Sequence, residues 1–166
     1  MTDEERRIRS YLQAQGAKLS PAELIDKVRA AMEELRAALF SVPPARLAER
    51  PAADDWSADE VMAHVVSAGA QFGGGIARIL DDGEPATTRG GPDGTAMSAT
   101  EWWERLDRAR TALFERVLCA DPMGHLDQTI EHPMFGPLNW RETLLFLRLH
   151  DLDHAGQLRK IAAALG

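Results

Sequence analysis

Four segments of this chain have the pattern of a helix N-terminus. A Ser or Asn stands three residues before a Glu at four places, which begin at Ser20, Ser57, Ser98 and Asn139. In this pattern the side chain of the first residue accepts a hydrogen bond from the backbone amide of the fourth. The glutamate side chain at the fourth position accepts one from the backbone amide of the first. Apolar residues follow each segment at steps of three and four, the period of a helix. One match is weak, but four that agree predict an all-α fold.

The apolar periodicities give the expected helices their ranges. Four are expected at about residues 21–40, 58–80, 100–119 and 140 to the end. Three glycines at residues 73–75 interrupt the second, either as a kink or as a site of close backbone packing. An extra N-terminal helix is expected over about residues 3–15, and a short extended segment over about residues 126–132. We predict a single domain, residues 1–166, built as a four-helix bundle.

Composition excludes several classes of function. The net charge is -7 and no Lys/Arg-rich run is present, so the chain is not expected to bind nucleic acid. No apolar stretch approaches the ~20 residues of a membrane span. The charged N-terminus lacks an apolar signal core, so we expect a cytoplasmic protein. Cys119 is the one cysteine, which excludes an internal disulfide.

Two histidines, His150 and His154, stand four residues apart in the last expected helix. Residues at this spacing lie on one face, with Cβ atoms about 6 Å apart, so both rings can reach one metal ion. They fall within the apolar stripe of the helix, and buried imidazoles need partners for their nitrogens. Two satisfied core histidines are the alternative interpretation.

A third histidine is expected beside them. His64 lies at the border of the apolar face of the second bundle helix. Its neighbours at helical spacing are small or polar, as in the wall of a cavity, and include Ser67, Ala68 and Gln71. Three histidine ligands with an open fourth position are typical of a reactive metal site, because structural zinc sites are normally closed by four protein ligands.

Three segments together resemble the DinB-like superfamily. They are WSADEVMAH at residues 56–64, HDLDHAGQL at 150–158 and, as in one subgroup, HPMFGPLN at 132–139. The resemblance covers most of the chain from about Ser20 onward. It implies a DinB-like four-helix bundle in which His64, His150 and His154 bind one divalent ion, with zinc, nickel, iron and manganese all found in the family. Some members are metal-dependent thiol S-transferases or mycothiol-dependent isomerases, and dimers are common.

The resemblance favours a thiol-dependent S-transferase or isomerase that acts on a small electrophile. A low-molecular-weight thiol is then the expected cosubstrate, although no thiol-binding motif is recognisable in the chain. A non-catalytic, stress-related module that binds metal or ligand is the alternative. A hydrolase is less favoured, because Asp151 replaces the glutamate of the His-Glu-x-x-His pattern.

Other polar residues are weaker candidates for the site. Asp151 is expected to act as a base or to orient a ligand, or else to be a helix-surface carboxylate. Gln71 is expected in the cavity wall, and Gln157 beside a ligand ring. His125 and His132 lie in a loop and are expected at the surface, with the pocket mouth as the alternative. The loop of residues 82–97, rich in Gly and Pro, is expected to influence the choice of substrate.

The last helix has a second apolar face. Leu145, Leu149 and Leu152 lie opposite the histidine stripe. A helix that is apolar on two faces buries both. We therefore expect either the N-terminal segment or a symmetric partner to cover this face, and we favour a homodimer.

Overall fold

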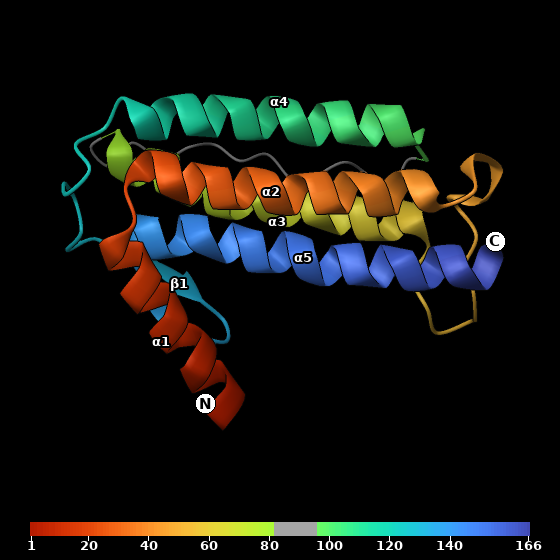
Figure 1. The fold of residues 1–166 in the computed structure, drawn as a ribbon, viewed down its shortest axis with the longest axis horizontal. Coiled ribbons are helices and arrows are strands. Elements are labelled where there is room, and N and C mark those ends of the chain that lie inside the picture. Colours follow the sequence, from red (N-terminus) through yellow and green to blue (C-terminus); the bar gives the residue numbers. More distant parts are fainter. Residues whose placement is uncertain (82–95) are drawn as a thin grey trace.

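The predicted helices form a bundle in a computed structural model of the chain, which describes residues 1–81 and 96–166. Four long helices lie side by side, and a fifth diverges from them at one end (Figure 1). The elements are α1 (Asp3–Lys18), α2 (Pro21–Ser41), a short 3-10 helix η1 (Pro44–Arg46), α3 (Ala58–Leu80), α4 (Ala99–Leu118), β1 (Ile130–His132), β2 (Gly136–Leu138) and α5 (Trp140–Leu165). The all-α prediction is confirmed. Most of the predicted 82–97 loop lies outside the described residues.

The helix starts are capped largely as predicted. Ser20, Ser57 and Asn139 each make both bonds of the capping box. The Ser98 side chain accepts a hydrogen bond from the amide of Glu101. The second bond of the capping box, from the Ser98 amide to the Glu101 carboxylate, is not formed. Thr2 caps α1 with both bonds of the capping box, and this cap was not predicted from the sequence. Because these bonds join residues only three apart, they locate the helix starts without help from the rest of the fold.

The three glycines of α3 do not end the helix, and of the two interpretations given to them the structure supports close backbone packing. The helix is continuous from Ala58 to Leu80. Close packing explains two of the glycines. A Cβ at Gly75 would lie 3.2 Å from Ile130 in β1, and one at Gly73 would lie 3.4 Å from Leu113 in α4. The glycines thus let the hairpin and α4 approach the backbone of α3.

The expected extended segment is part of an antiparallel hairpin. Ile130 pairs with Leu138, and His132 pairs with Gly136. Gly136 has a φ of 71°, in the left-handed region that glycine adopts without strain. The hairpin brings residues 132–135 against α3 and α5, where they form part of the candidate site.

Helix α1 covers the second apolar face of α5. Leu12 packs in one buried cluster with Leu145, and Leu149 lies against the same cluster. Arg141 donates to the carbonyls of Gly16 and Leu19, which ties the end of α1 to the start of α5. One of the two covers expected from the sequence is therefore present within the chain, and the homodimer stays a prediction.

The core holds two fully buried tryptophans with satisfied indole groups. Trp102 donates to Asp59 at 2.7 Å, and Trp140 donates to the carbonyl of Gly124 at 2.9 Å. A buried indole N–H without a partner is costly, so these bonds hold α4 on α3 and α5 on the preceding loop. Within the described ranges, no helix has the length and apolar character needed to cross a membrane.

Candidate metal centre

Three histidines from two helices meet inside the bundle. His64 comes from α3, and His150 and His154 come from successive turns of α5. Their ring centroids lie 4.4 to 5.1 Å apart, and one nitrogen from each ring can be chosen so that all three lie within 4.8 Å of one another. The sequence analysis predicted this set, and the fold brings its members together in a cluster that can hold a metal ion.

The positions of the ring nitrogens fit a shared divalent ion. The Nε2 atoms of His64 and His150 face each other at 3.1 Å. Two nitrogens bound at about 2.0–2.1 Å to one tetrahedral ion lie about 3.3 Å apart, which is close to the observed separation. The cluster supplies three neutral nitrogen donors, so a divalent ion held there keeps a position for a water or substrate molecule.

The surroundings of the cluster lower the pKa of two of its rings. Burial, reinforced by the neighbouring rings and by Arg110, lowers the pKa of His150 to about 3. Burial and the charge of His154 also lower the pKa of His64. A neutral imidazole offers a lone pair, whereas a protonated one does not, so the two rings are ready to bind metal near neutral pH.

Two rings are oriented by identifiable neighbours. Nδ1 of His154 lies 2.8 Å from Oε1 of Gln157, an amide oxygen that accepts; the proton is therefore on Nδ1 and Nε2 is free for a metal. This agrees with the role expected for Gln157. Trp56 packs edge-on against His64, with centroids 5.4 Å apart. Nδ1 of His150 is buried and has no hydrogen-bond partner among the described residues, and this ring packs against Phe146.

A pocket of about 590 Å³ opens beside the cluster. His64 and His150 lie on its wall, with Ala68 and Gln71, which the sequence analysis placed in a cavity wall. The expectation of a mainly small and polar wall was incomplete, because most of the lining is apolar and aromatic. Its other members are Ile8, Phe72, His132, Pro133, Met134, Phe135, Phe146, Leu149 and Asp153. The volume is in the range of small-molecule sites.

The family of the chain follows from its sequence match and its fold together. The family model of the DinB superfamily matches residues 24–158, which include all three histidines. The chain belongs to the DinB superfamily. Its fold is similar to the crystal structure of TT2238, a four-helix bundle protein, with a TM-score of 0.63 and 28% identity over 83% of this chain and 96% of that chain. No curated protein gives a significant match.

In this DinB superfamily protein, His132 is not a surface residue. Its side chain is buried in a stack of aromatic rings and lines the pocket. The sequence suggested the surface because the residue lies in a Pro- and Gly-rich loop, whereas the hairpin folds it inward. His125 does not line this pocket; its Nδ1 lies 3.2 Å from Gln128.

Asp151 lies on the opposite side of α5 from the pocket. Its carboxylate is fully buried and forms two hydrogen bonds with Arg110 of α4, at 2.8 and 2.9 Å. The interpretation as a helix-surface carboxylate was therefore wrong. The structure does not bring Asp151, a candidate base, to the pocket, whereas Gln71, the other candidate, does line it and is exposed.

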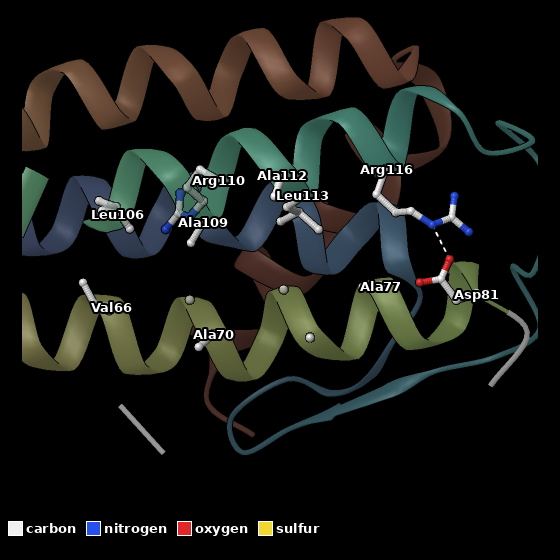
Figure 2. Close-up of a pocket in the computed structure, with 13 residues that line it drawn as sticks. Val66, Ala70, Ala77, Asp81, Leu106, Ala109, Arg110, Ala112, Leu113 and Arg116 are labelled. Carbon is white, nitrogen blue, oxygen red and sulfur yellow. Dashed lines mark hydrogen bonds and ion pairs between the residues drawn. The ribbon is translucent and has the colours of Figure 1, made fainter. Parts of the chain in front are cut away.

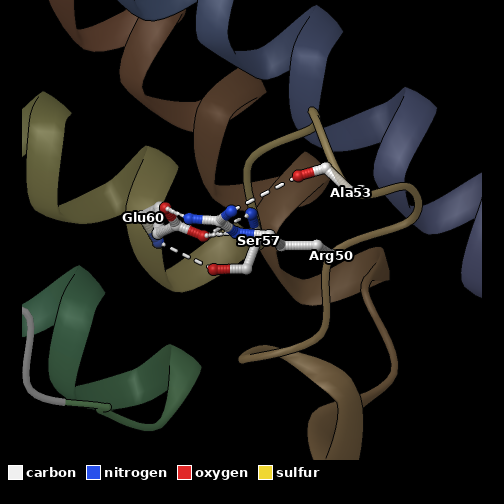
Figure 3. A network of polar contacts seen from close by, with 4 residues as sticks. All are labelled: Arg50, Ala53, Ser57 and Glu60. Atoms are coloured by element: carbon white, nitrogen blue, oxygen red, sulfur yellow. Dashed lines mark hydrogen bonds and ion pairs between the residues drawn. The ribbon is translucent and has the colours of Figure 1, made fainter.

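Glu60, one turn before His64, is also engaged elsewhere. It closes the capping box with Ser57 and binds Arg50 through both carboxylate oxygens, at 2.7 and 2.8 Å (Figure 3). Hydrogen bonds from the Arg50 side chain and from the Ser57 amide lower the pKa of Glu60 to about 2. Glu60 is consequently a structural carboxylate that holds the loop before α3 in place.

A second pocket, of about 360 Å³, lies between α3 and α4 (Figure 2). Small residues of both helices line it, and an ion pair between Arg116 and Asp81 lies at one end. None of the three clustered histidines lines it. Among the described residues that line it, Asp81 alone could bind a metal ion, so the three-histidine cluster is the candidate site.

The three-histidine cluster predicts a measurable metal content. Protein expressed without a His-tag and purified without added metal is expected to carry close to one divalent ion per chain. Replacing His64 by Ala removes one of three ligands, so affinity for Zn²⁺ should fall by more than the about 10–100-fold typical of losing an outer-shell partner. Elemental analysis and competition with a chromophoric chelator measure both quantities.

His125→Asn is the matched control, because it also removes an imidazole but lies outside the cluster. His125 has a φ of 59°, which Asn tolerates. Equal metal content in His64→Ala and His125→Asn would show that His64 is not a ligand.

Proposed function

We propose that this protein is a cytoplasmic, divalent-metal-dependent enzyme that transfers a low-molecular-weight thiol to a small electrophile or isomerises such a substrate. The observation that carries the proposal is the three-histidine cluster, of which His64 and His150 lie on the wall of an apolar pocket. A divalent ion there supplies Lewis-acid chemistry, which lowers the pKa of a thiol or a water molecule that it binds. Imidazole ligands suit zinc, nickel and iron, and the family resemblance adds manganese.

The carboxylates that line this pocket favour a thiol over water as the nucleophile. A hydrolase of the His-Glu-x-x-His kind needs a carboxylate base after the first histidine. Asp151 holds that position, but both of its oxygens are occupied by Arg110. Of the described residues that line the pocket, only Asp153 carries a carboxylate, and it is exposed. A thiol is nucleophilic once it is deprotonated and needs no further base for attack.

The apolar wall favours a small organic electrophile. Phe146 packs against His150, with ring centroids 5.7 Å apart, and Phe72 and Phe135 line the same pocket. Apolar walls with a few polar groups are typical of sites for small molecules. The alternative is a module that binds a metal ion or a small molecule without catalysis. It would use the same three histidines and would show no turnover.

A thiol screen tests the proposal. The metal-loaded protein is mixed with glutathione, bacillithiol or mycothiol and with a chromogenic electrophile such as 1-chloro-2,4-dinitrobenzene. We expect metal-dependent turnover with one thiol. His150→Ala should abolish turnover while far-UV circular dichroism shows nearly unchanged helix content, and His125→Asn should keep turnover. No turnover with any thiol, together with metal-linked binding of another ligand, would establish the binding module instead.

A further inference from the structure

His132 has a fixed orientation in the pocket wall. Its ring stacks on Phe135, with centroids 4.6 Å apart and planes inclined by 18°, and on Phe72, at 5.4 Å and 21°. Phe146 meets it edge-on at 4.4 Å. Three aromatic contacts from α3, the hairpin and α5 hold the ring, so it has little freedom to turn.

The hairpin also fixes the tautomer of His132. The backbone amides of Met134 and Phe135 both point at its Nδ1, at 3.1 and 3.3 Å. A backbone N–H only donates, so Nδ1 accepts and holds no proton. The proton of the neutral ring is therefore on Nε2.

The Nε2–H of His132 has no hydrogen-bond partner among the residues that the structure describes. The side chain lines the same pocket as His64 and His150 and keeps 7% of its surface exposed. Nε2 is not among the fully buried side-chain atoms, so a ligand or a water molecule can accept a hydrogen bond from it. None of the described residues that line the pocket is Lys or Arg, so the side chains around His132 favour a neutral group over an anionic one.

We propose that Nε2 of His132 is a preset hydrogen-bond donor for a neutral carbonyl oxygen, and that the substrates are small, planar, conjugated carbonyl compounds. The aromatic wall takes the planar body, and His132 takes the oxygen. This assignment of substrate class rests on the proposed thiol transfer, whereas the hydrogen bond itself can be measured without any thiol. His132 touches the substrate and is in this sense a catalytic residue.

The reaction that follows is a conjugate addition. The thiol S–H bond breaks, and the sulfur forms a C–S bond to the β-carbon of the substrate. The electron pair of the C=C bond moves toward the carbonyl oxygen, where the Nε2–H of His132 stabilises the developing charge. A proton equivalent to the one lost by the thiol then forms a C–H bond at the α-carbon. No oxidant or reductant is needed, and His132 stays neutral throughout.

The test uses benzylideneacetone, an aromatic enone, with its carbonyl labelled with ¹³C. It is added without thiol to the protein reconstituted with Zn²⁺, and the carbonyl stretch is followed by difference infrared spectroscopy. Wild-type protein is expected to bind the ketone and to move the stretch to lower frequency, as a hydrogen bond to the oxygen requires. The hydrocarbon trans-β-methylstyrene, which lacks the oxygen, should bind more weakly.

His132→Asn is the decisive variant. Its Oδ1 can still accept from the amides of Met134 and Phe135, so the turn is kept, but its amide does not reach the Nε2 position. The dissociation constant for the ketone should rise about fivefold to tenfold, and the frequency shift should disappear. Binding of the hydrocarbon should be unchanged. His132→Gln, whose amide N–H reaches the Nε2 position, should restore part of the shift.

Gln71→Leu is the matched control, because it removes the side-chain amide donor among the described residues that line the pocket. The shift should persist in this variant. The same shift in wild type and His132→Asn, or no binding of the ketone to wild type, would overturn the inference. A His132-dependent shift without turnover with any thiol would keep this subsite and reject the proposed function. Turnover with a thiol, together with a frequency shift that does not depend on His132, would keep the proposed function and reject this subsite.

Discussion

Replacing Asp151 by Ala is expected to destabilise the fold by about 3–5 kcal/mol, the cost of breaking a buried ion pair by removing one partner. Arg110 is 2% exposed, and both bonds from its terminal nitrogens go to Asp151. Without the carboxylate, its charge is left in the core between α4 and α5 with no counter-charge. Urea unfolding of the metal-free protein, followed by circular dichroism, measures the loss.

Two further variants show whether the ion pair is the cause. Asp153→Ala removes an exposed carboxylate two residues away on the same helix and should change stability by no more than about 0.5 kcal/mol. The double variant Arg110→Met, Asp151→Leu replaces the pair by apolar side chains and should recover most of the stability. If Asp151→Ala unfolds at the same urea concentration as Asp153→Ala, the pair does not stabilise the fold.

Metal-free protein is expected to lose stability as the pH falls below about 6.5. Burial first, then the neighbouring charges, lowers the pKa of His150 from 6.5 to about 3 in the folded state. Between these values the unfolded chain binds a proton that the folded chain does not, so protons favour unfolding. Above about pH 6.5 the free energy of unfolding has its full contribution from this group. It should decrease by at most about 1.4 kcal/mol per pH unit, or about 3 kcal/mol by pH 4.

His150→Gln isolates this contribution. The pKa of His64 is lowered too, and carboxylates such as Glu60 add their own losses at lower pH, so one pH profile contains several groups. Subtracting the His150→Gln profile from the wild-type profile removes the contributions of the groups that both proteins contain. Urea unfolding from pH 7 to pH 4 with a chelator present should show a shallower profile for the variant. Parallel profiles would contradict a low pKa for His150.

The placement of the three histidines was predictable because their signals are local or come from the family resemblance. His150 and His154 share a helix face by their spacing alone. The choice of His64 needed the small residues around it and the resemblance to the DinB-like superfamily. The range of α3 was also predicted, since its start depends on the Ser57 cap and its face on the apolar period.

The sequence by itself determined the all-α character, the caps, the helix faces and the set of candidate metal ligands, because these depend on residues within a turn or two of one another. Only the tertiary structure decided the roles of Asp151 and His132. Arg110, the partner of Asp151, lies 41 residues earlier on another helix, and His132 is buried because the hairpin folds between Phe72 and Phe146. Burial and pairing of a polar group depend on the elements packed against it, and a periodicity along one helix carries no information about them.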